Sequence, residues 1–206
     1  MGRKERRLQE QKELKQSILD AAREIALEEG WRNVTMRKIA EKIEYSHAAI
    51  YEYFENKDVL MLELLREGFR LLIQDLQVAQ TSADEPHEAL VHMAHAYWNF
   101  AWRYPELYRV MNGLDGVPFS VDEAQVEGQK VGELLGVVIK VICQRNGTVV
   151  SDAYVDNQVH LLWSMSHGII SLAMVGRIAG GKEKAFSLSE QALHDALQKW
   201  GSKSQA

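Results

Sequence analysis

The side chains best suited to contact with a charged partner lie close together, between residues 35 and 57. They carry hydroxyl, guanidinium, imidazole and ammonium groups beside two small alanines: Thr35, Arg37, His47, Ala48, Ala49, Tyr51, Tyr53 and Lys57. Hydroxyl and cationic groups bind phosphate oxygens, imidazole hydrogen-bonds to base edges, and alanine contacts thymine methyl groups. The set predicts contact with double-stranded DNA, and we assign no catalytic residue to the chain.

Apolar spacing indicates which elements must hold this cluster. Thr35 and Ser46 are good N-cap residues. The apolar residues after them fall at helical spacing: Met36, Ile39, Ala40 and Ile43, then Ile50 and Phe54. The pattern predicts two short helices, over 36–43 and 47–54, joined by a tight turn. Such a pair is typical of a helix-turn-helix, whose second helix enters the DNA major groove.

The predicted second helix turns Ile50 and Phe54 inward, so its opposite face centres on Ala48, Ala49 and Glu52. His47, in the first turn, is the predicted polar contact to a base. The predicted phosphate anchors are Thr35, Arg37, Tyr51, Tyr53 and Lys57, and the N–H groups at the helix starts Thr35 and Asn56 serve the same phosphates. The alternative is an ordinary core corner with Tyr51 and Tyr53 packed inside.

A wider set of residues around this stretch resembles a known family. The matching residues are Ile18-Leu-Asp-Ala-Ala-Arg23, Glu29-Gly30, Val34-Thr35, Ile39-Ala40, Ala49-Ile-Tyr51, Tyr53-Phe54 and Lys57-Asp-Val-Leu60. Together they are similar to the N-terminal signature of the TetR family of bacterial transcriptional regulators. One position departs from the family pattern, because Glu44 stands where the family has a turn glycine. A left-handed backbone there would strain Glu44, and its charge counts against phosphate contact by Lys42.

Composition fits a modest protein of 206 residues with 46% hydrophobic residues and a net charge of −5. It holds no apolar run long enough to span a membrane and no apolar segment of a secretory signal. The lone Cys143 lies in an apolar run, where a buried small hydrophobe is expected. We therefore expect a cytoplasmic, nucleoid-associated protein that has no membrane partner and no cofactor.

Charge is distributed unevenly along the chain. Residues 1–60 hold equal numbers of basic and acidic side chains, so the acidic excess lies in residues 61–206. Basic residues outnumber acidic ones in the first fifteen positions. This start of the chain is either an arm that reaches DNA phosphates or the minor groove, or a solvated tail.

The rest of the chain also has helical patterning. Its three prolines, Pro86, Pro105 and Pro118, stand where a helix would begin or break. The predicted helices are 10–29, 36–43, 47–54, 57–80, 86–103, 105–112, 122–144, 152–178 and 187–200, with loops near 81–85, 113–121, 145–151 and 179–186. The β-branched run Val137–Cys143 is the least clear helix, although Ser120-x-x-Glu123 resembles a capping box and Asn146-Gly147 a helix stop.

The predicted fold is all-α in two domains. Residues 1–60 form a three-helix DNA-binding domain with the helix-turn-helix, and residues 61–206 form a helical bundle with a ligand pocket and a dimer interface. The interface is expected on 152–178 and the last helix, which carry apolar residues at near-helical spacing: Val155, Val159, Leu162, Ile169, Leu172, Ala173, Leu188, Ala192, Leu193, Ala196, Leu197 and Trp200. Gly168, Ser171 and Gly176 would allow close helix approach. The alternative is that this stripe completes the core of one subunit.

Aromatic and polar residues of the second domain are candidates for an effector site. The predicted ligand-binding residues are Tyr97, Trp98, Trp102, Tyr108, Met111, Trp163 and His167. Tyrosine, tryptophan and histidine can line an apolar pocket and orient a ligand, although ordinary core packing is the alternative. The segment 101–111 and the set Trp163-x-x-x-His167-Gly168 resemble the WHG-type C-terminal domain of some TetR relatives. That resemblance implies a small, apolar or aromatic effector bound inside the bundle.

The predicted function is a homodimeric, ligand-responsive regulator, a repressor released from a palindromic DNA operator by its effector. One alternative is a helical metal-binding protein or enzyme that uses histidines such as His92 and His95, which lie three apart. No nucleophile motif, phosphate loop or HExxH pattern supports it, and we assign no metal. A second alternative is a ligand carrier whose helix-turn-helix no longer binds DNA.

Overall fold

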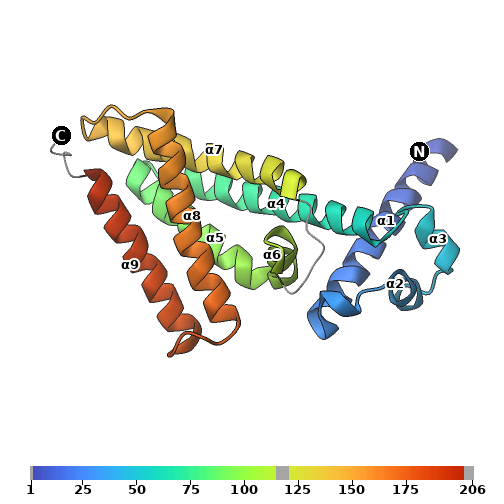
Figure 1. The fold of residues 1–206 in the computed structure, drawn as a ribbon. Helices are drawn as coiled ribbons and strands as arrows, with labels where there is room; N and C mark the ends of the chain where they lie inside the picture. Colours follow the sequence, from blue (N-terminus) through green and yellow to red (C-terminus); the bar gives the residue numbers. More distant parts are fainter. Residues whose placement is uncertain (1, 115–120, 202–206) are drawn as a thin grey trace. The chain divides into compact units, whose positions relative to one another are not determined.

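The structure is a computed structural model that describes residues 2–114 and 121–201. Throughout these two ranges the regular structure is helical and contains no β-strand, which confirms the all-α fold (Figure 1). The predicted roles of Pro118 as a helix breaker and of Ser120 as a cap lie outside the described residues. The other two prolines, Pro86 and Pro105, are the first residues of their helices, as predicted.

The elements follow one another along the chain with short connections. They are α1 (Arg3–Glu29), the 3₁₀ helix η1 (Trp31–Asn33), α2 (Met36–Lys42), α3 (His47–Tyr51), α4 (Lys57–Thr81), α5 (Pro86–Arg103), α6 (Pro105–Met111), α7 (Val121–Arg145), α8 (Asp152–Met174) and α9 (Gly181–Gly201). The run Val137–Cys143 lies inside α7 and is helical, with Cys143 buried. Asn146-Gly147 does end that helix, since Gly147 has a φ of 77°.

The chain forms two compact units that do not follow a single cut in the sequence. Unit 1 contains the residues up to Phe69 together with Tyr104–Gln125, and unit 2 contains Arg70–Arg103 and the residues from Val126 onward. Two of the three unit boundaries fall inside α4 and α7, and the third falls between α5 and α6. The expected division after residue 60 into a DNA-binding and an effector-binding domain therefore stays a prediction about function.

Unit 1 is built around the apolar face of α1. Ile18 and Ala22 of α1, Ile39 of α2 and Ile50 of α3 are fully buried, and α1 packs against η1, α2 and α6. The indole N–H of Trp31 donates a hydrogen bond to the backbone oxygen of Glu106, 2.9 Å away, which ties η1 to α6. The core of unit 1 thus holds the two short helices α2 and α3 in a fixed setting.

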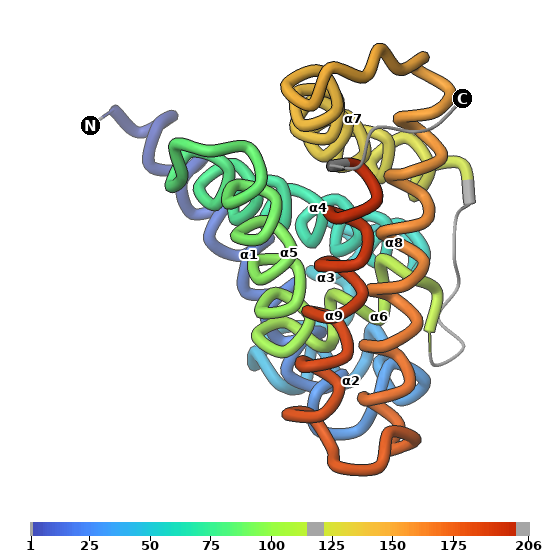
Figure 2. Tube along the Cα trace, turned by 90° about the vertical axis from the view of Figure 1, so that its left-hand side faces the viewer, coloured from blue at the N-terminus to red at the C-terminus, as the bar shows by residue number. Residues whose placement is uncertain are grey.

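Unit 2 is organised by contacts of α5, α8 and α9. Helix α9 packs along α8, and both contact α5 (Figure 2). Helix α7 approaches α8 closely, because a Cβ at Gly136 would lie 3.3 Å from Cγ1 of Val155. Val155, Val159 and Leu162 of the predicted dimer stripe are consequently buried within the subunit.

Two predicted boundaries at the N-terminal end were wrong. Helix α1 begins at Arg3, well before residue 10, so the basic start is helical and exposed, and its contact with DNA stays a prediction. Exposed pairs four residues apart support this extension, among them Arg6 with Glu10 at 3.0 Å. Helix α3 ends at Tyr51 instead of residue 54, because the N–H groups of both Tyr53 and Phe54 turn back to the carbonyl of Ile50.

The predicted end of the eighth helix and the loop 179–186 were also wrong. Helix α8 stops at Met174 because Gly176 takes a φ of 70° and the N–H of Arg177 donates to the Leu172 carbonyl at 2.8 Å. This is the usual left-handed glycine stop. Gly176 therefore ends the helix and does not serve close helix packing. Helix α9 then starts at Gly181, six residues earlier than the predicted residue 187.

Candidate nucleic-acid interface and effector site

The two short helices of unit 1 begin at the predicted caps. The side chain of Thr35 accepts a hydrogen bond from the Lys38 N–H, and that of Ser46 accepts one from the Ala49 N–H, each at 3.2 Å. These bonds satisfy N–H groups that have no partner within the helix. The start of α3 is therefore fixed to within one residue, which fixes the face that its side chains present.

The turn between these helices contains a left-handed residue. Glu44 has a φ of 59° and is the only non-glycine residue with a positive φ in the described parts of the chain. The N–H of Tyr45 donates to the Ala40 carbonyl at 3.0 Å and closes the turn. The strain expected from glutamate in place of the family's glycine is thus present in the backbone, because a Cβ disfavours this conformation.

Helix α3 has one buried and one exposed face. Ile50 and Phe54 are buried in the core of unit 1, whereas His47, Ala48 and Tyr51 are exposed and Ala49 is half-buried. The rings of His47 and Tyr51 meet edge to face at 4.9 Å. Tyr51 is 45% exposed, so the alternative of a core corner with Tyr51 inside is wrong. The exposed face is free of bulky side chains at its centre, and a helix of this shape fits the major groove.

The predicted phosphate anchors differ in how they are held. Arg37 is exposed and pairs with Glu41 at 2.8 Å, and this contact raises the pKa of the guanidinium. The ammonium of Lys57 donates to the Trp31 carbonyl at 2.9 Å, and partial burial lowers the pKa of this lysine. Thr35 is exposed and Tyr53 half-buried. All five anchors, Tyr51 included, belong to unit 1 with His47.

Lys42, which we had set aside as a phosphate contact, is engaged elsewhere. Its ammonium lies 3.1 Å from a carboxylate oxygen of Glu24 and 3.8 Å from one of Glu28, both on α1. The hydrogen bond to Glu24 raises the pKa of Lys42. Asn56, expected to lie at a helix start, caps α4 by accepting from the Val59 N–H at 2.9 Å.

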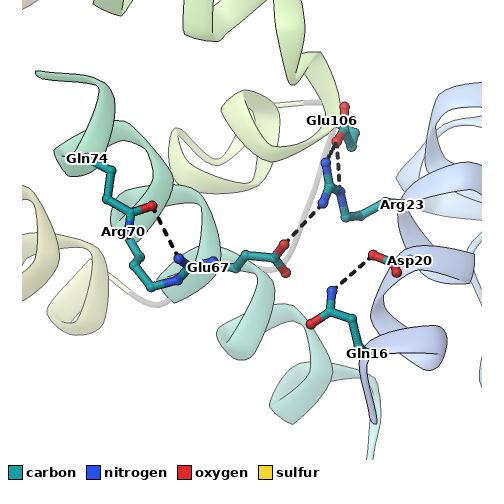
Figure 3. A network of polar contacts seen from close by, with 7 residues as sticks. All are labelled: Gln16, Asp20, Arg23, Glu67, Arg70, Gln74 and Glu106. Carbon is teal, nitrogen blue, oxygen red and sulfur yellow. Dashed lines mark hydrogen bonds and ion pairs between the residues drawn. The ribbon is translucent and has the colours of Figure 1, made fainter. Parts of the chain in front are cut away.

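A buried ionic cluster joins three helices of unit 1 (Figure 3). Arg23 of α1 lies between the carboxylates of Glu67 on α4 and Glu106 on α6, with separations of 3.1 and 2.9 Å. The Glu106 side chain is 2% exposed. In the sequence, Arg23 stands out only as part of the family signature, and no local pattern marks its partners Glu67 and Glu106. The cluster links α1 to α4 and α6, and α2, on which α3 packs, lies against α1.

The predicted effector residues do not gather around one cavity. Tyr97 and Trp98 of α5 line a small hollow in unit 2, and the ring of Trp102 lies tilted beside that of Trp98 with ring centres 5.7 Å apart. Trp163 and His167 of α8 stack on each other at 5.8 Å. Burial lowers the pKa of His167, which also contacts the Ser171 hydroxyl at 3.3 Å.

Tyr108 and Met111 belong to the other compact unit. Both lie on α6 in the core of unit 1, where Tyr108 is fully buried. A Cβ at Gly68 would lie only 2.6 Å from the Met111 sulfur, so α4 and α6 touch closely at this point. Packing of α6 against α4 is the role that the structure gives to Met111.

Two residues of unit 2 that were not among the predicted effector residues line the hollow beside Trp98. They are His95 of α5 and Glu190 of α9, whose side chains meet at 3.2 Å. His95 had been considered only as a metal ligand together with His92. His92 instead contacts the Ser82 hydroxyl at 2.8 Å. Across residues 2–114 and 121–201, no three or more His, Cys, Asp or Glu side chains converge as metal ligands do.

The fold and the exposed face of α3 define the class of protein: a helix-turn-helix DNA-binding protein. Residues 18–64 match the family described as bacterial regulatory proteins, tetR family. Residues 90–197 match the tetracyclin repressor-like C-terminal domain, a range that includes both segments with the WHG-type resemblance. This chain belongs to the tetR family, whose members are transcription regulators and not enzymes.

Individual relatives agree with this assignment. The chain is 36% identical over 76 residues to the HTH-type transcriptional regulator BetI of Brucella abortus (strain 2308), a match that covers 37% of this chain and 38% of BetI. The match thus spans less than two fifths of that relative's length. The chain is also 29% identical over 91 residues to the uncharacterized HTH-type transcriptional regulator YobS of Bacillus subtilis (strain 168), covering 44% of this chain and 47% of YobS.

Solved structures share the fold over nearly the whole chain. A protein of unknown function from Rhodococcus sp. RHA1 superposes with a TM-score of 0.78 at 20% identity, covering 92% of this chain and 96% of that one. FadR of Thermus thermophilus, a TetR-family transcriptional repressor solved with lauroyl-CoA, gives a TM-score of 0.64 at 18% identity, covering 93% and 97%. Among the described helices, none has the length and apolar character needed to cross a bilayer.

Proposed function

We propose that this regulator is a homodimeric repressor that binds a palindromic operator and is released by a small effector bound in unit 2. The observation that carries the proposal is the capped, exposed face of α3, which offers His47, Ala48 and Tyr51 on a rigid core. A protein of this kind works in the cytoplasm, where its DNA lies.

Base contact falls to His47, with Ala48 and Ala49 against thymine methyl groups. Thr35, Arg37, Tyr51, Tyr53 and Lys57 hold phosphates. Lys57 uses one of its three N–H donors on the Trp31 carbonyl, which leaves two for a phosphate. One histidine and two alanines distinguish few bases, so two half-sites read together, ~34–36 Å apart, supply the specificity.

The dimer proposal is supported by apolar side chains that no part of the described subunit covers. They lie on α8, in the segment after it and on α9: Leu161, Trp163, Met165, Leu172, Val175 and Leu188 are each more than one third exposed. Of the stripe predicted from sequence, Leu172 and Leu188 belong to this face, whereas Val155, Val159, Leu162, Leu193 and Trp200 lie in the subunit core. A two-fold partner would bury the exposed set.

Effector release requires that ligand and operator favour different conformations. The neighbouring FadR binds lauroyl-CoA, which supports an effector site in the helical C-terminal part of this chain as well. The enclosed hollow beside Trp98 measures about 20 Å³, enough for one water, so an effector must move side chains to enter. The effector then weakens operator binding by the same coupling free energy by which the operator weakens effector binding, typically ~1–3 kcal/mol.

The proposal is tested by selecting DNA from a random pool with the full chain, then repeating the selection in the presence of candidate effectors. We expect one palindromic sequence with half-sites about one helical turn apart, lost when an effector is added. Enrichment of no sequence would instead favour a ligand carrier. An operator that no effector displaces would leave a DNA-binding regulator that is not ligand-responsive.

A further inference from the structure

Two hollows of unit 2 meet at one pair of side chains. The first is the enclosed hollow beside Tyr97 and Trp98. The second is an open groove of about 410 Å³ between α5 and α9, lined by residues that include Val91 and Leu197. Only three residues line both hollows: His95, Glu190 and Leu193. The groove has the volume of a small-molecule site, and the small hollow adjoins it at these three residues.

The contact between His95 and Glu190 lies on the boundary that the groove and the hollow share. Nε2 of His95 lies 3.2 Å from a carboxylate oxygen of Glu190, which links α5 to α9. The two side chains are 36% and 50% exposed, so this bond is reached by solvent and costs little to break. Rotation of His95 would join the two hollows and leave the Glu190 carboxylate at their junction.

The chemistry around this junction is suited to a cation. Neither hollow is lined by a lysine or an arginine, and Glu190 supplies the one carboxylate of both linings. Aromatic rings stand behind it: Phe186 lies 5.3 Å from the rings of both His95 and Trp98. Aromatic faces together with a carboxylate are the groups that bind organic ammonium ions.

The same aromatic cluster already holds a cation of this chain. The ammonium of Lys182, at the start of α9, lies 4.6 Å from the centre of the Trp102 ring. The ring of Trp102 lies tilted beside that of Trp98, with the two ring centres 5.7 Å apart. The indole N–H of Trp102 is buried and has no hydrogen-bond partner among the described residues. Lys182 thus occupies the Trp102 face within this chain, which leaves Trp98 and Phe186 as the aromatic rings near Glu190.

We propose that groove and hollow form one binding site for a small organic ammonium ion with an apolar body, gated by the His95–Glu190 contact. The ammonium displaces His95 from Glu190, and the apolar body lies in the groove over Val91 and Leu197. The inference rests on the proposed effector function and names its ligand class. Apart from the imidazoles of His95 and His194, no cationic side chain lines the groove or the hollow, so an anionic ligand would find no lysine or arginine there.

The test compares three probes that share one apolar body and differ in charge: 4-phenylbutylamine, 4-phenylbutan-1-ol and 4-phenylbutanoate. Binding to the full chain is measured by isothermal titration calorimetry without DNA. We expect the amine to bind about ten-fold more tightly than the alcohol, and the carboxylate to bind most weakly. Equal affinities, a preference for the carboxylate, or no binding of the amine would overturn the proposal.

Substitutions then assign the preference to the gate. Glu190→Gln should bring the amine to the affinity of the alcohol, whereas Glu183→Gln, an exposed acid on the same helix outside both linings, should keep the ten-fold difference. His95→Ala should strengthen amine binding, because the amine no longer competes for Glu190. A preference retained in Glu190→Gln, or lost in Glu183→Gln, contradicts the assignment.

Salt offers a measure that needs no variant. An ammonium held by a partly exposed carboxylate should lose affinity as salt is raised, while the alcohol should not. A difference between amine and alcohol that is independent of salt would overturn the role of Glu190 even if Glu190→Gln fails to fold.

Because these titrations contain no DNA, amine binding without operator release would refute only the proposed function. Operator release by a neutral ligand alone would refute only the ligand class.

Discussion

Arg23 donates a hydrogen bond from Nε to Oε1 of Glu106 and forms an ion pair with the same oxygen through Nη2, each over 2.9 Å, although the residues lie 83 positions apart. A third nitrogen reaches Glu67 at 3.1 Å. One guanidinium thus serves two largely buried carboxylates, and three helices of unit 1 meet on it. This one guanidinium adds an ionic contact to the apolar packing that holds α1 in unit 1.

Removing that cation should strongly destabilise unit 1. Arg23→Met keeps the apolar stem of the side chain but leaves the carboxylates of Glu106 and Glu67 without their shared guanidinium. Breaking a buried ion pair from one side costs ~3–5 kcal/mol, and we expect a loss of this order in the free energy of unfolding. Urea unfolding followed by circular dichroism measures it.

The matched control is Arg37→Met, because Arg37 pairs with a single exposed carboxylate, Glu41. Solvent screens that pair, so the urea midpoint should not move. An Arg23→Met midpoint equal to that of Arg37→Met would show that the cluster does not stabilise unit 1.

Glu44→Gly should raise the stability of the protein. Residue 44 has a φ of 59°, a conformation that costs a residue with a Cβ ~1–2 kcal/mol and glycine nothing. Glycine is also more flexible in the unfolded chain, which offsets ~0.4–1 kcal/mol of that gain. The expected net stabilisation is up to ~1 kcal/mol, measured as a higher melting temperature.

Glu44→Ala separates the backbone effect from the charge. Alanine removes the carboxylate but keeps the Cβ, so it should not raise the melting temperature as glycine does. Equal stabilisation by both substitutions would mean that the charge of Glu44, and not its backbone, was unfavourable.

Acid should destabilise the protein in part through His167. Burial lowers the pKa of this histidine in the folded state below the ordinary value of 6.5. Between the two pKa values the unfolded chain binds the proton more readily, so stability falls as the pH drops below about 6.5. His167→Gln should reduce the pH dependence of the melting temperature in this range. An unchanged dependence would contradict a half-buried His167 that is neutral in the folded protein.

Leu172→Asp should convert the protein to monomers. Leu172 is 46% exposed on α8, within the apolar face assigned to the two-fold partner. A carboxylate there would be buried unpaired in the dimer, which is costly. Sedimentation equilibrium gives the mass. Val149→Asp, at a residue that is 96% exposed in the α7–α8 connection, should remain dimeric. If Leu172→Asp remains dimeric like Val149→Asp, the dimer interface lies on another surface.

Local sequence signals predicted the helix-turn-helix well because its determinants are local. Thr35 and Ser46 each cap the helix that follows by accepting a hydrogen bond from an N–H group three residues further along the chain. The inward face of α3 follows from the spacing of Ile50 and Phe54. The absent turn glycine likewise pointed to the left-handed backbone at Glu44. Each of these features depends on residues within one or two helical turns.

The effector site could not be predicted in this way. Its gate joins His95 to Glu190, which are 95 positions apart, and neither residue lies in a distinctive local pattern. Tyr108 and Met111 follow the aromatic run closely in sequence, yet Pro105 starts a new helix whose residues pack in the core of unit 1. Apolar spacing on α8 marked a buried face correctly but could not distinguish a core from a dimer interface.

The central claim is that α3 reads DNA through His47, and a selection from a random DNA pool with His47→Ala tests it most directly. His47 is exposed in the first turn of α3, where a side chain reaches base edges. The comparison variant is Lys57→Ala, because a phosphate contact should affect all sequences alike and flatten the salt dependence by a slope of ~1. We predict that His47→Ala loses preference at one base position in each half-site while Lys57→Ala keeps the operator sequence. An operator unchanged by His47→Ala would contradict this account of recognition.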